Sequence, residues 1–277
     1  MKLFYRRYGE GPPLIILHGL YGSSDNWVSI AKKISDHFTI YLPDQRNHGQ
    51  SPHSDVHDYE SMSNDLREFA GDNNLGRFFL AGHSMGGKTA ALFALKWPEL
   101  LDGLIIADIS PFETKSSNSE SYNQHLSILK ILQETNISKA ASRDEIERIL
   151  ADRIRSGRDR ALIMKNIRRN DDGSFSWKTN NASLLKNIDS ILDSITATER
   201  TFEQVTGFPV LFLKGENSDY LPDADRSKIL KLFPAAEFRI IKNAGHWLHT
   251  DNPEAVIEVF KGLSPTRSCR QELQGGS

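Results

Sequence analysis

Short apolar runs alternate along the chain with longer stretches in which apolar residues recur every three or four positions. Continuous apolar runs are typical of strands buried on both faces of a parallel sheet, and the longer period is typical of amphipathic helices. Strands are predicted over 2–8, 14–17, 38–42, 77–81, 101–109, 208–215 and 236–241. Helices are predicted over 27–34, 59–73, 88–97, 223–233 and from 252 onward. This alternation favours an α/β fold, with a mostly parallel sheet flanked by helices.

Residues 112–207 interrupt the alternation. Ser, Asn, Lys, Arg and Glu dominate there, and the apolar residues follow helical spacing. The segment therefore predicts a helical cap inserted between two strands of the main domain, where it would close over a site and exclude water. The main domain is expected over 1–111 and 208–264, and the polar end of the chain, 265–277, is expected to be disordered.

Several elements can be placed inside the expected cap. Ser142 and Glu145 form a capping box in front of an apolar stripe that begins at Ile146. Ser156-Gly157 is expected to end that helix. The remaining elements are expected to be a helix over 161–167, an extended piece over 175–177 and an amphipathic helical stripe from 184 to 195.

Composition and charge narrow the functional classes. A chain of 277 residues is long enough for one large α/β domain with an insertion. The sequence contains no run of eighteen apolar residues, so no membrane-spanning helix is predicted, and the N-terminus lacks the apolar core of a signal peptide. The net charge of −2 gives no reason to expect nucleic acid or an anionic membrane as a partner. The single cysteine, Cys269, cannot form an internal disulfide, so a cytoplasmic location is expected.

Gly82-His83-Ser84-Met85-Gly86 has the pattern Gly-x-Ser-x-Gly between a predicted strand and a predicted helix. A serine on such a sharp turn is the nucleophile elbow of α/β-hydrolases. The turn leaves almost no room for flanking side chains, which explains Gly82 and Gly86, and it raises the Ser84 hydroxyl above the sheet. The backbone N–H of Met85 would then point toward a developing oxyanion.

The loop that follows the run 14–17 is expected to supply a second oxyanion donor. In α/β-hydrolases this loop carries that donor, and we assign the role to the backbone N–H of Leu20. His18 is expected to be a buried histidine that shapes the loop rather than a proton-transfer group. The polar loop 44–51 follows another strand, so we expect it to border the site and to be braced by its own side chains.

The triad base is expected late in the chain, because the order in this fold is serine, acid, histidine. His246 follows the last predicted strand and would take the Ser84 proton and return it to the leaving group. His249, three residues later, is the alternative, but a helical turn after His246 would direct it elsewhere.

The triad acid has two candidates. Most α/β-hydrolases carry it after the strand that returns from the cap, where this chain has Ser218 followed by Asp219. The other location is one strand earlier, at Asp108, where a buried carboxylate could hold the correct histidine tautomer. We favour Asp108 as the acid and expect Ser218 to hydrogen-bond the same histidine, with Asp219 as the alternative acid.

The chain resembles the YbfF-like esterases of the α/β-hydrolase superfamily. Four segments carry the resemblance: His18–Trp27, Asp44–Ser51, Gly82–Lys88 and Asp108–Pro111. The resemblance implies hydrolysis of carboxylic esters, or of acyl thioesters such as acyl-CoA, with no metal or organic cofactor. It also implies an acid after the strand that ends at Asp108 and a serine at position 218. The chain departs from the pattern at Gln45, where relatives often have leucine, and at Asp219, which many lack.

These features together predict a serine hydrolase that works through an acyl-enzyme. A carbon–carbon bond hydrolase or a cofactor-free perhydrolase could use the same triad, and a small-molecule receptor with slow turnover could retain it. A serine at the elbow argues against dehalogenase or epoxide-hydrolase chemistry, in which the elbow carries aspartate.

Overall fold

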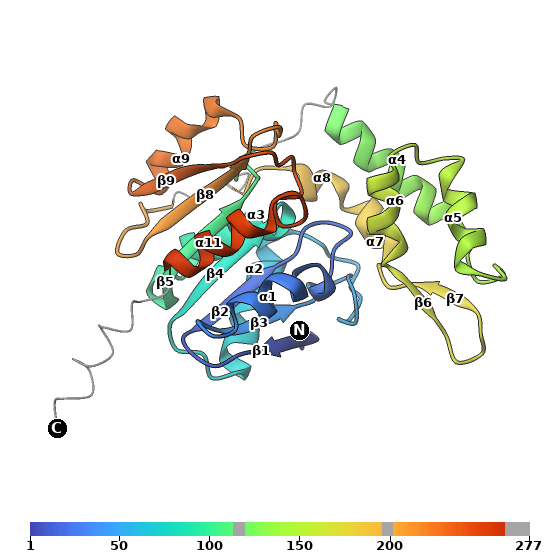
Figure 1. Cartoon of the computed structure of the whole chain (residues 1–277), viewed down its shortest axis with the longest axis horizontal. Helices are drawn as coiled ribbons and strands as arrows, with labels where there is room; N and C mark the ends of the chain where they lie inside the picture. Colours follow the sequence, from blue (N-terminus) through green and yellow to red (C-terminus); the bar gives the residue numbers. More distant parts are fainter. Residues whose placement is uncertain (113–119, 196–201, 264–277) are drawn as a thin grey trace.

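A seven-stranded sheet forms the centre of the molecule in the computed structural model, which describes residues 1–112, 120–195 and 202–263 (Figure 1). Its strands are β1 (Tyr5–Tyr8), β2 (Pro13–Leu17), β3 (Thr39–Pro43), β4 (Phe78–His83), β5 (Leu101–Ala107), β8 (Val210–Gly215) and β9 (Ala236–Ile241). Their order is β1-β3-β2-β4-β5-β8-β9. Only β1 runs antiparallel to its neighbour, and the other pairs are parallel. The predicted α/β fold with a mostly parallel sheet is confirmed.

Helices cover both faces of the sheet. One face carries α1 (Val28–Ile34) and α11 (Pro253–Leu263), and the other carries α2 (Tyr59–Asp72), α3 (Met85–Lys96) and α9 (Arg226–Leu232). Shorter helices lie in the loops: η1 (Ser24–Trp27), η2 (Pro98–Leu100), η3 (Asp223–Asp225) and α10 (Leu248–Asp251). No helix within the described ranges is long and apolar enough to cross a membrane.

Alternate residues of each central strand pack on opposite helical layers. In β2, Leu14 and Ile16 join the cluster of α1 and α11, whereas Ile15 and Leu17 join the cluster of α2 and α3. Both faces are therefore apolar, which is why these strands read as continuous apolar runs. The carboxyl ends of the parallel strands share one edge of the sheet, where open α/β sheets place their ligands.

The described residues between β5 and β8, 120–195, are called the insertion below. They contain α4 (Glu120–Glu134), α5 (Arg143–Ala151), α6 (Gly157–Met164), β6 (Ile167–Arg169), β7 (Phe175–Trp177), α7 (Asn181–Lys186) and α8 (Ile188–Leu192). None of these strands joins the central sheet, because β6 and β7 pair only with each other. Figure 1 shows the insertion, coloured green to yellow, gathered to one side of the sheet.

Two expectations about the insertion are wrong in detail. Ser156-Gly157 does not end α5, which stops at Ala151. It starts α6, because the Ser156 hydroxyl accepts the N–H of Asp159 at 3.2 Å and so caps the new helix. Ile167 belongs to a hairpin strand rather than to the helix predicted over 161–167. The predicted amphipathic stripe from 184 to 195 falls largely on two helices, α7 and α8, which meet at Asn187.

Asn47, in the loop after β3, fastens the start of α7 to the main domain. Its φ of 65° lies in the left-handed region, which asparagine tolerates better than most residues. Its Oδ1 accepts from Asn180 Nδ2 at 3.1 Å, and its Nδ2 donates to Ser183 Oγ at 3.2 Å. Its carbonyl oxygen accepts the Asn180 N–H at 3.0 Å. Asn47 is fully buried, so these bonds fix the loop against the insertion.

Lys88, one turn past Ser84 in α3, contacts the insertion just beyond the end of α8, the helix that follows α7. Its side chain is buried, and Nζ donates to the carbonyl of Asp193 at 2.7 Å, just beyond α8. The Tyr59 hydroxyl donates to the Ile191 carbonyl at 2.5 Å, and the Lys88 ammonium lies 5.7 Å from the centre of the Tyr59 ring. A helix C-terminus presents unpaired carbonyls and the negative end of the helix dipole, so a buried cation there is stabilising.

We expect Lys88→Met to lower the free energy of unfolding by about 2–4 kcal/mol, because methionine keeps the length of the side chain but removes the buried ammonium that donates to the Asp193 carbonyl. Urea unfolding followed by circular dichroism measures the change. Lys33→Met, at an exposed position of α1, is the matched control and should change that free energy by less than about 0.5 kcal/mol. Equal losses in the two variants would contradict this role for Lys88.

Candidate active site

Ser84 joins β4 directly to α3 on a strained turn. Its φ of 54° and ψ of −120° are unusual for a residue with a side chain. Its N–H donates to the Ala107 carbonyl at 3.0 Å, and its carbonyl accepts the Lys88 N–H at 3.1 Å. A Cβ atom at Gly82 would lie 2.1 Å from the carbonyl oxygen of Gly86, so the turn requires glycine there. Strand, turn and helix thus hold Ser84 in the geometry of a nucleophile elbow.

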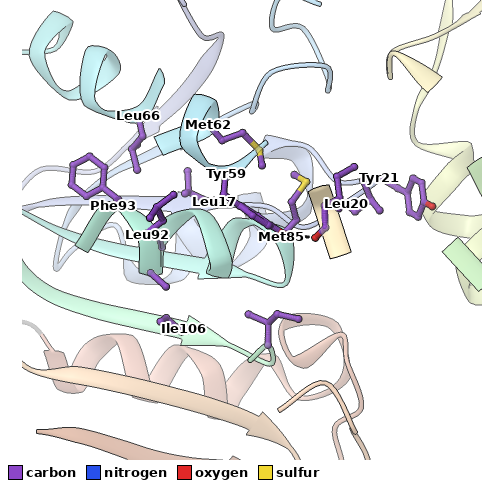
Figure 2. Packing of buried hydrophobic residues seen from close by; sticks show 14 of the residues in the cluster. Leu17, Leu20, Tyr21, Tyr59, Met62, Leu66, Met85, Leu92, Phe93 and Ile106 are labelled. Carbon is purple, nitrogen blue, oxygen red and sulfur yellow. Dashed lines mark hydrogen bonds between the residues drawn. The ribbon is translucent and has the colours of Figure 1, made fainter. Parts of the chain in front are cut away.

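The first turn of α3 packs against the loop after β2. A Cβ atom at Gly86 would lie 2.6 Å from the His18 carbonyl oxygen, and one at Gly19 would lie 3.1 Å from the Cβ of Ser84. Figure 2 shows the buried side chains of Leu20 and Met85 where these two segments meet. Within the described residues, the N–H groups of Leu20 and Met85 donate to no protein atom. In the described part of the chain, two backbone N–H groups without a protein acceptor therefore lie in the segments that adjoin Ser84.

His246 and Asp108 meet beside this turn. His246 Nδ1 donates to Asp108 Oδ2 at 2.8 Å, and the His246 ring lies 4.7 Å from the ring of His83, the residue before Ser84. Asp108 follows β5 with a φ of 51°, and its side chain is wholly buried. Its Oδ1 accepts the Gly215 N–H at 2.8 Å. A buried, hydrogen-bonded carboxylate is thus paired with a histidine whose ring lies near His83, the residue before Ser84.

A family model described as the alpha/beta hydrolase fold matches residues 12–253. The chain belongs to this family. The match spans most of the chain and includes the turn at Ser84, the loop after β2, and both Asp108 and His246.

Individual relatives of this α/β-hydrolase agree with that assignment. The chain is 36% identical over 261 residues to the sn-1-specific diacylglycerol lipase ABHD11 of Danio rerio, an alignment that covers 93% of this chain and 80% of the relative. It is 28% identical over 251 residues to Esterase YbfF of Escherichia coli (strain K12), covering 90% and 91%. A solved structure described as a marine microorganism esterase is 45% identical and superimposes with a TM-score of 0.90, covering 95% of this chain and 99% of that one. The resemblance to YbfF-like esterases is confirmed.

Within the described residues of this α/β-hydrolase, Ser218 makes no hydrogen bond to the histidine, contrary to our expectation. Its hydroxyl donates instead to Asp108 Oδ2, the same oxygen that His246 contacts. Gly215, the last residue of β8, and Ser218 in the following loop both donate to Asp108, so this segment supplies donors to the carboxylate. Asp219 is exposed, and no hydrogen bond within the described ranges joins it to His246.

Two other histidines near the site are held away from proton transfer. His18 Nε2 accepts the Gln45 N–H at 2.9 Å, its Nδ1 donates to the Gly19 carbonyl at 2.9 Å, and burial lowers its pKa to about 4. It therefore shapes the loop, as expected. His249 is buried against Trp27, with the ring centres 4.4 Å apart, and burial lowers its pKa to about 3. The hydrogen bond to Asp108 is made by His246.

Side chains of the polar loop after β3 brace it, as expected, and they do so mostly against neighbouring segments. Asp44 accepts the N–H groups of Ser24 and Gln50 at 2.6 and 2.8 Å. Arg46 makes a two-pronged ion pair with Asp65, at 2.6 and 2.9 Å. The described residues contain no group of three or more His, Cys, Asp or Glu that could hold a metal ion.

Sequence reasoning missed Tyr220. Its ring is stacked on His246, with centres 3.8 Å apart and planes 20° from parallel. Its only signal in the sequence is its position two residues after Ser218, at the place where many α/β-hydrolases carry the acid.

Proposed function

We propose that this chain hydrolyses carboxylic esters by acyl transfer, with Ser84 as nucleophile, His246 as general base and Asp108 as the acid of the triad. The observation that carries the proposal is the 2.8 Å hydrogen bond between His246 Nδ1 and the buried Asp108 carboxylate beside the strained turn of Ser84. The esterase and lipase names of the relatives support an ester carbonyl as the electrophile.

Each group has a defined part in the reaction. Asp108 keeps the His246 proton on Nδ1, which leaves Nε2 free to take the Ser84 proton as the hydroxyl attacks the carbonyl. The N–H groups of Leu20 and Met85 stabilise the oxyanion of the tetrahedral intermediate. His246 then gives the proton to the leaving alcohol, and water releases the acid from Ser84 through the same groups. Ser218 donates to the same Asp108 oxygen that His246 contacts, and so helps to hold the carboxylate in place.

The substrate is a small acyl ester, and the proposal extends to acyl thioesters such as acyl-CoA. The acyl-enzyme step is the same for both, because both present a carbonyl with a displaceable group. We also propose that residues 112–207 form a cap that covers the site and limits the acyl chain. The contacts from Asn47 and Lys88 to α7 and α8 support a fixed position for part of this cap.

Steady-state hydrolysis of p-nitrophenyl esters from acetate to decanoate tests this function, with acyl-CoA hydrolysis followed in parallel by free-thiol release. We expect turnover on the esters, with a maximum at the chain length that fits beneath the cap. No turnover on any ester or thioester would contradict the proposal. Tight ligand binding without turnover would then favour a receptor.

A further inference from the structure

The Tyr220 side chain lies between the triad histidine and helix α4 of the insertion. We propose that it is a positioning residue, whose ring fixes the plane of the His246 imidazole and whose hydroxyl ties that imidazole to the insertion. The inference rests on the proposed function, because it assigns a partner to the proposed general base.

The main chain of Tyr220 is held by the loops that surround the acid. Its N–H donates to Ser218 Oγ at 3.3 Å, and Ser218 in turn donates to Asp108. Its carbonyl accepts the Ser110 N–H at 2.8 Å, and Ser110 is two residues after Asp108. The Ser110 hydroxyl is anchored on Asp225 at 2.6 Å. Tyr220 is therefore fixed in the same frame as the carboxylate that binds His246.

A single hydrogen bond at Nδ1 leaves the imidazole free to turn about the line to Asp108. The Tyr220 ring removes that freedom, because it covers a face of the imidazole at 3.8 Å. His83 packs nearby, with ring centres 4.7 Å apart, and its Nε2 donates to the His246 carbonyl at 2.7 Å. The ring and the main chain of His246 are thus both held in place, so its Nε2 atom keeps one direction. The imidazolium that forms during acyl transfer also faces the electron-rich Tyr220 ring, which stabilises a cation.

The other end of Tyr220 contacts α4. Its hydroxyl accepts from Ser121 Oγ at 3.1 Å and lies 3.4 Å from His125 Nε2, two residues one helical turn apart. The Tyr21 hydroxyl donates to the His125 carbonyl at 3.3 Å, so the loop with the second oxyanion donor contacts the same helix turn. A displacement of α4 would therefore move both Tyr220, which is stacked on His246, and the loop after β2 that contains Tyr21.

Two substitutions of Tyr220 distinguish the contribution of its ring from that of its hydroxyl. Tyr220→Leu removes the stacked ring, and we expect kcat for p-nitrophenyl acetate to fall by about tenfold to a hundredfold with little change in KM, because a misdirected base slows the chemical step. Tyr220→Phe keeps the ring and should restore most of kcat. Asn217→Ala, an exposed position in the same loop, is the control and should match wild type. Rates are expressed per active site, titrated with diethyl p-nitrophenyl phosphate, so that unfolded protein does not count.

A double-mutant cycle tests the link to the insertion. Tyr220→Phe and Ser121→Ala each remove the same hydrogen bond, so the double variant should have a kcat/KM no lower than the slower single variant. Fully additive losses would overturn the link. A kcat for Tyr220→Leu equal to wild type, or a Tyr220→Phe variant as slow as Tyr220→Leu, would overturn the positioning role. Ser84→Ala is measured alongside: turnover in that variant would count against the proposed function, whereas an inactive Ser84→Ala beside an unaffected Tyr220→Leu counts against this inference alone.

Discussion

Replacing Ser84 with alanine is expected to lower kcat for p-nitrophenyl esters by a factor of about 10⁴ to 10⁶, with a much smaller change in KM. The substitution removes the nucleophile but leaves the buried pair of His246 and Asp108 and the adjoining amides in place. Substrate can still bind, while the acyl-enzyme route is lost. The left-handed turn is set by the contacts of Gly82 with Gly86, so alanine should keep the fold.

The measurement is steady-state hydrolysis of p-nitrophenyl butyrate at high enzyme concentration. Ser190→Ala, at an exposed position of α8, is the matched control and should retain the wild-type rate. A Ser84→Ala enzyme that keeps more than about one hundredth of wild-type kcat would contradict the assigned nucleophile, since loss of a triad serine costs far more than that.

Asp108→Asn is expected to lower kcat by a factor of about 10⁴. The carboxylate oxygen that accepts from His246 Nδ1 also accepts from Ser218, and its partner oxygen accepts from Gly215. Asparagine preserves the shape, but its amide favours the wrong tautomer and no longer stabilises the imidazolium. Because the side chain is wholly buried, solvent cannot compensate for the loss of the negative charge.

Asp219→Asn is the paired experiment, because Asp219 is the rival acid in the sequence. Its side chain is exposed, so we expect kcat to stay close to wild type. Both variants are assayed with p-nitrophenyl butyrate after equal folding is checked by thermal unfolding. The reverse pattern, with a slow Asp219→Asn and a normal Asp108→Asn, would move the acid to the loop after β8.

The residues of the candidate site were predictable because each of them follows a strand that the sequence marks clearly. Ser84, Asp108 and His246 come directly or shortly after β4, β5 and β9, whose apolar runs are continuous because helices bury both faces. The carboxyl ends of parallel strands share one edge of the sheet, so residues far apart in the chain could be expected to meet there.

Contacts between distant segments were not predictable from local patterns. The partner of Ser218 depends on where the β8 loop meets Asp108, and the stacking of Tyr220 depends on where that loop meets His246. Inside the insertion, a serine followed by glycine suits either end of a helix. Tertiary packing decides between them, and Ser156 caps the start of α6.

Lys88 illustrates the same limit. Its position in the sequence gives no sign that the ammonium is buried, because a lysine is usually exposed, yet α3 is buried from Met85 to Leu95. The structure shows what the buried ammonium contacts: it donates to the Asp193 carbonyl, just beyond α8, at 2.7 Å. The polar contacts between the main domain and the insertion therefore could not be predicted from the sequence and are known only from the structure.

Trapping the acyl-enzyme tests the central claim most directly. Wild-type enzyme is mixed with excess p-nitrophenyl butyrate, quenched in acid within milliseconds, digested and analysed by mass spectrometry. The account predicts a butyryl group on the peptide that contains Ser84, formed together with a burst of about one equivalent of p-nitrophenol per active site. A burst with the acyl group on another residue, or steady turnover with no modified Ser84 peptide, would contradict it.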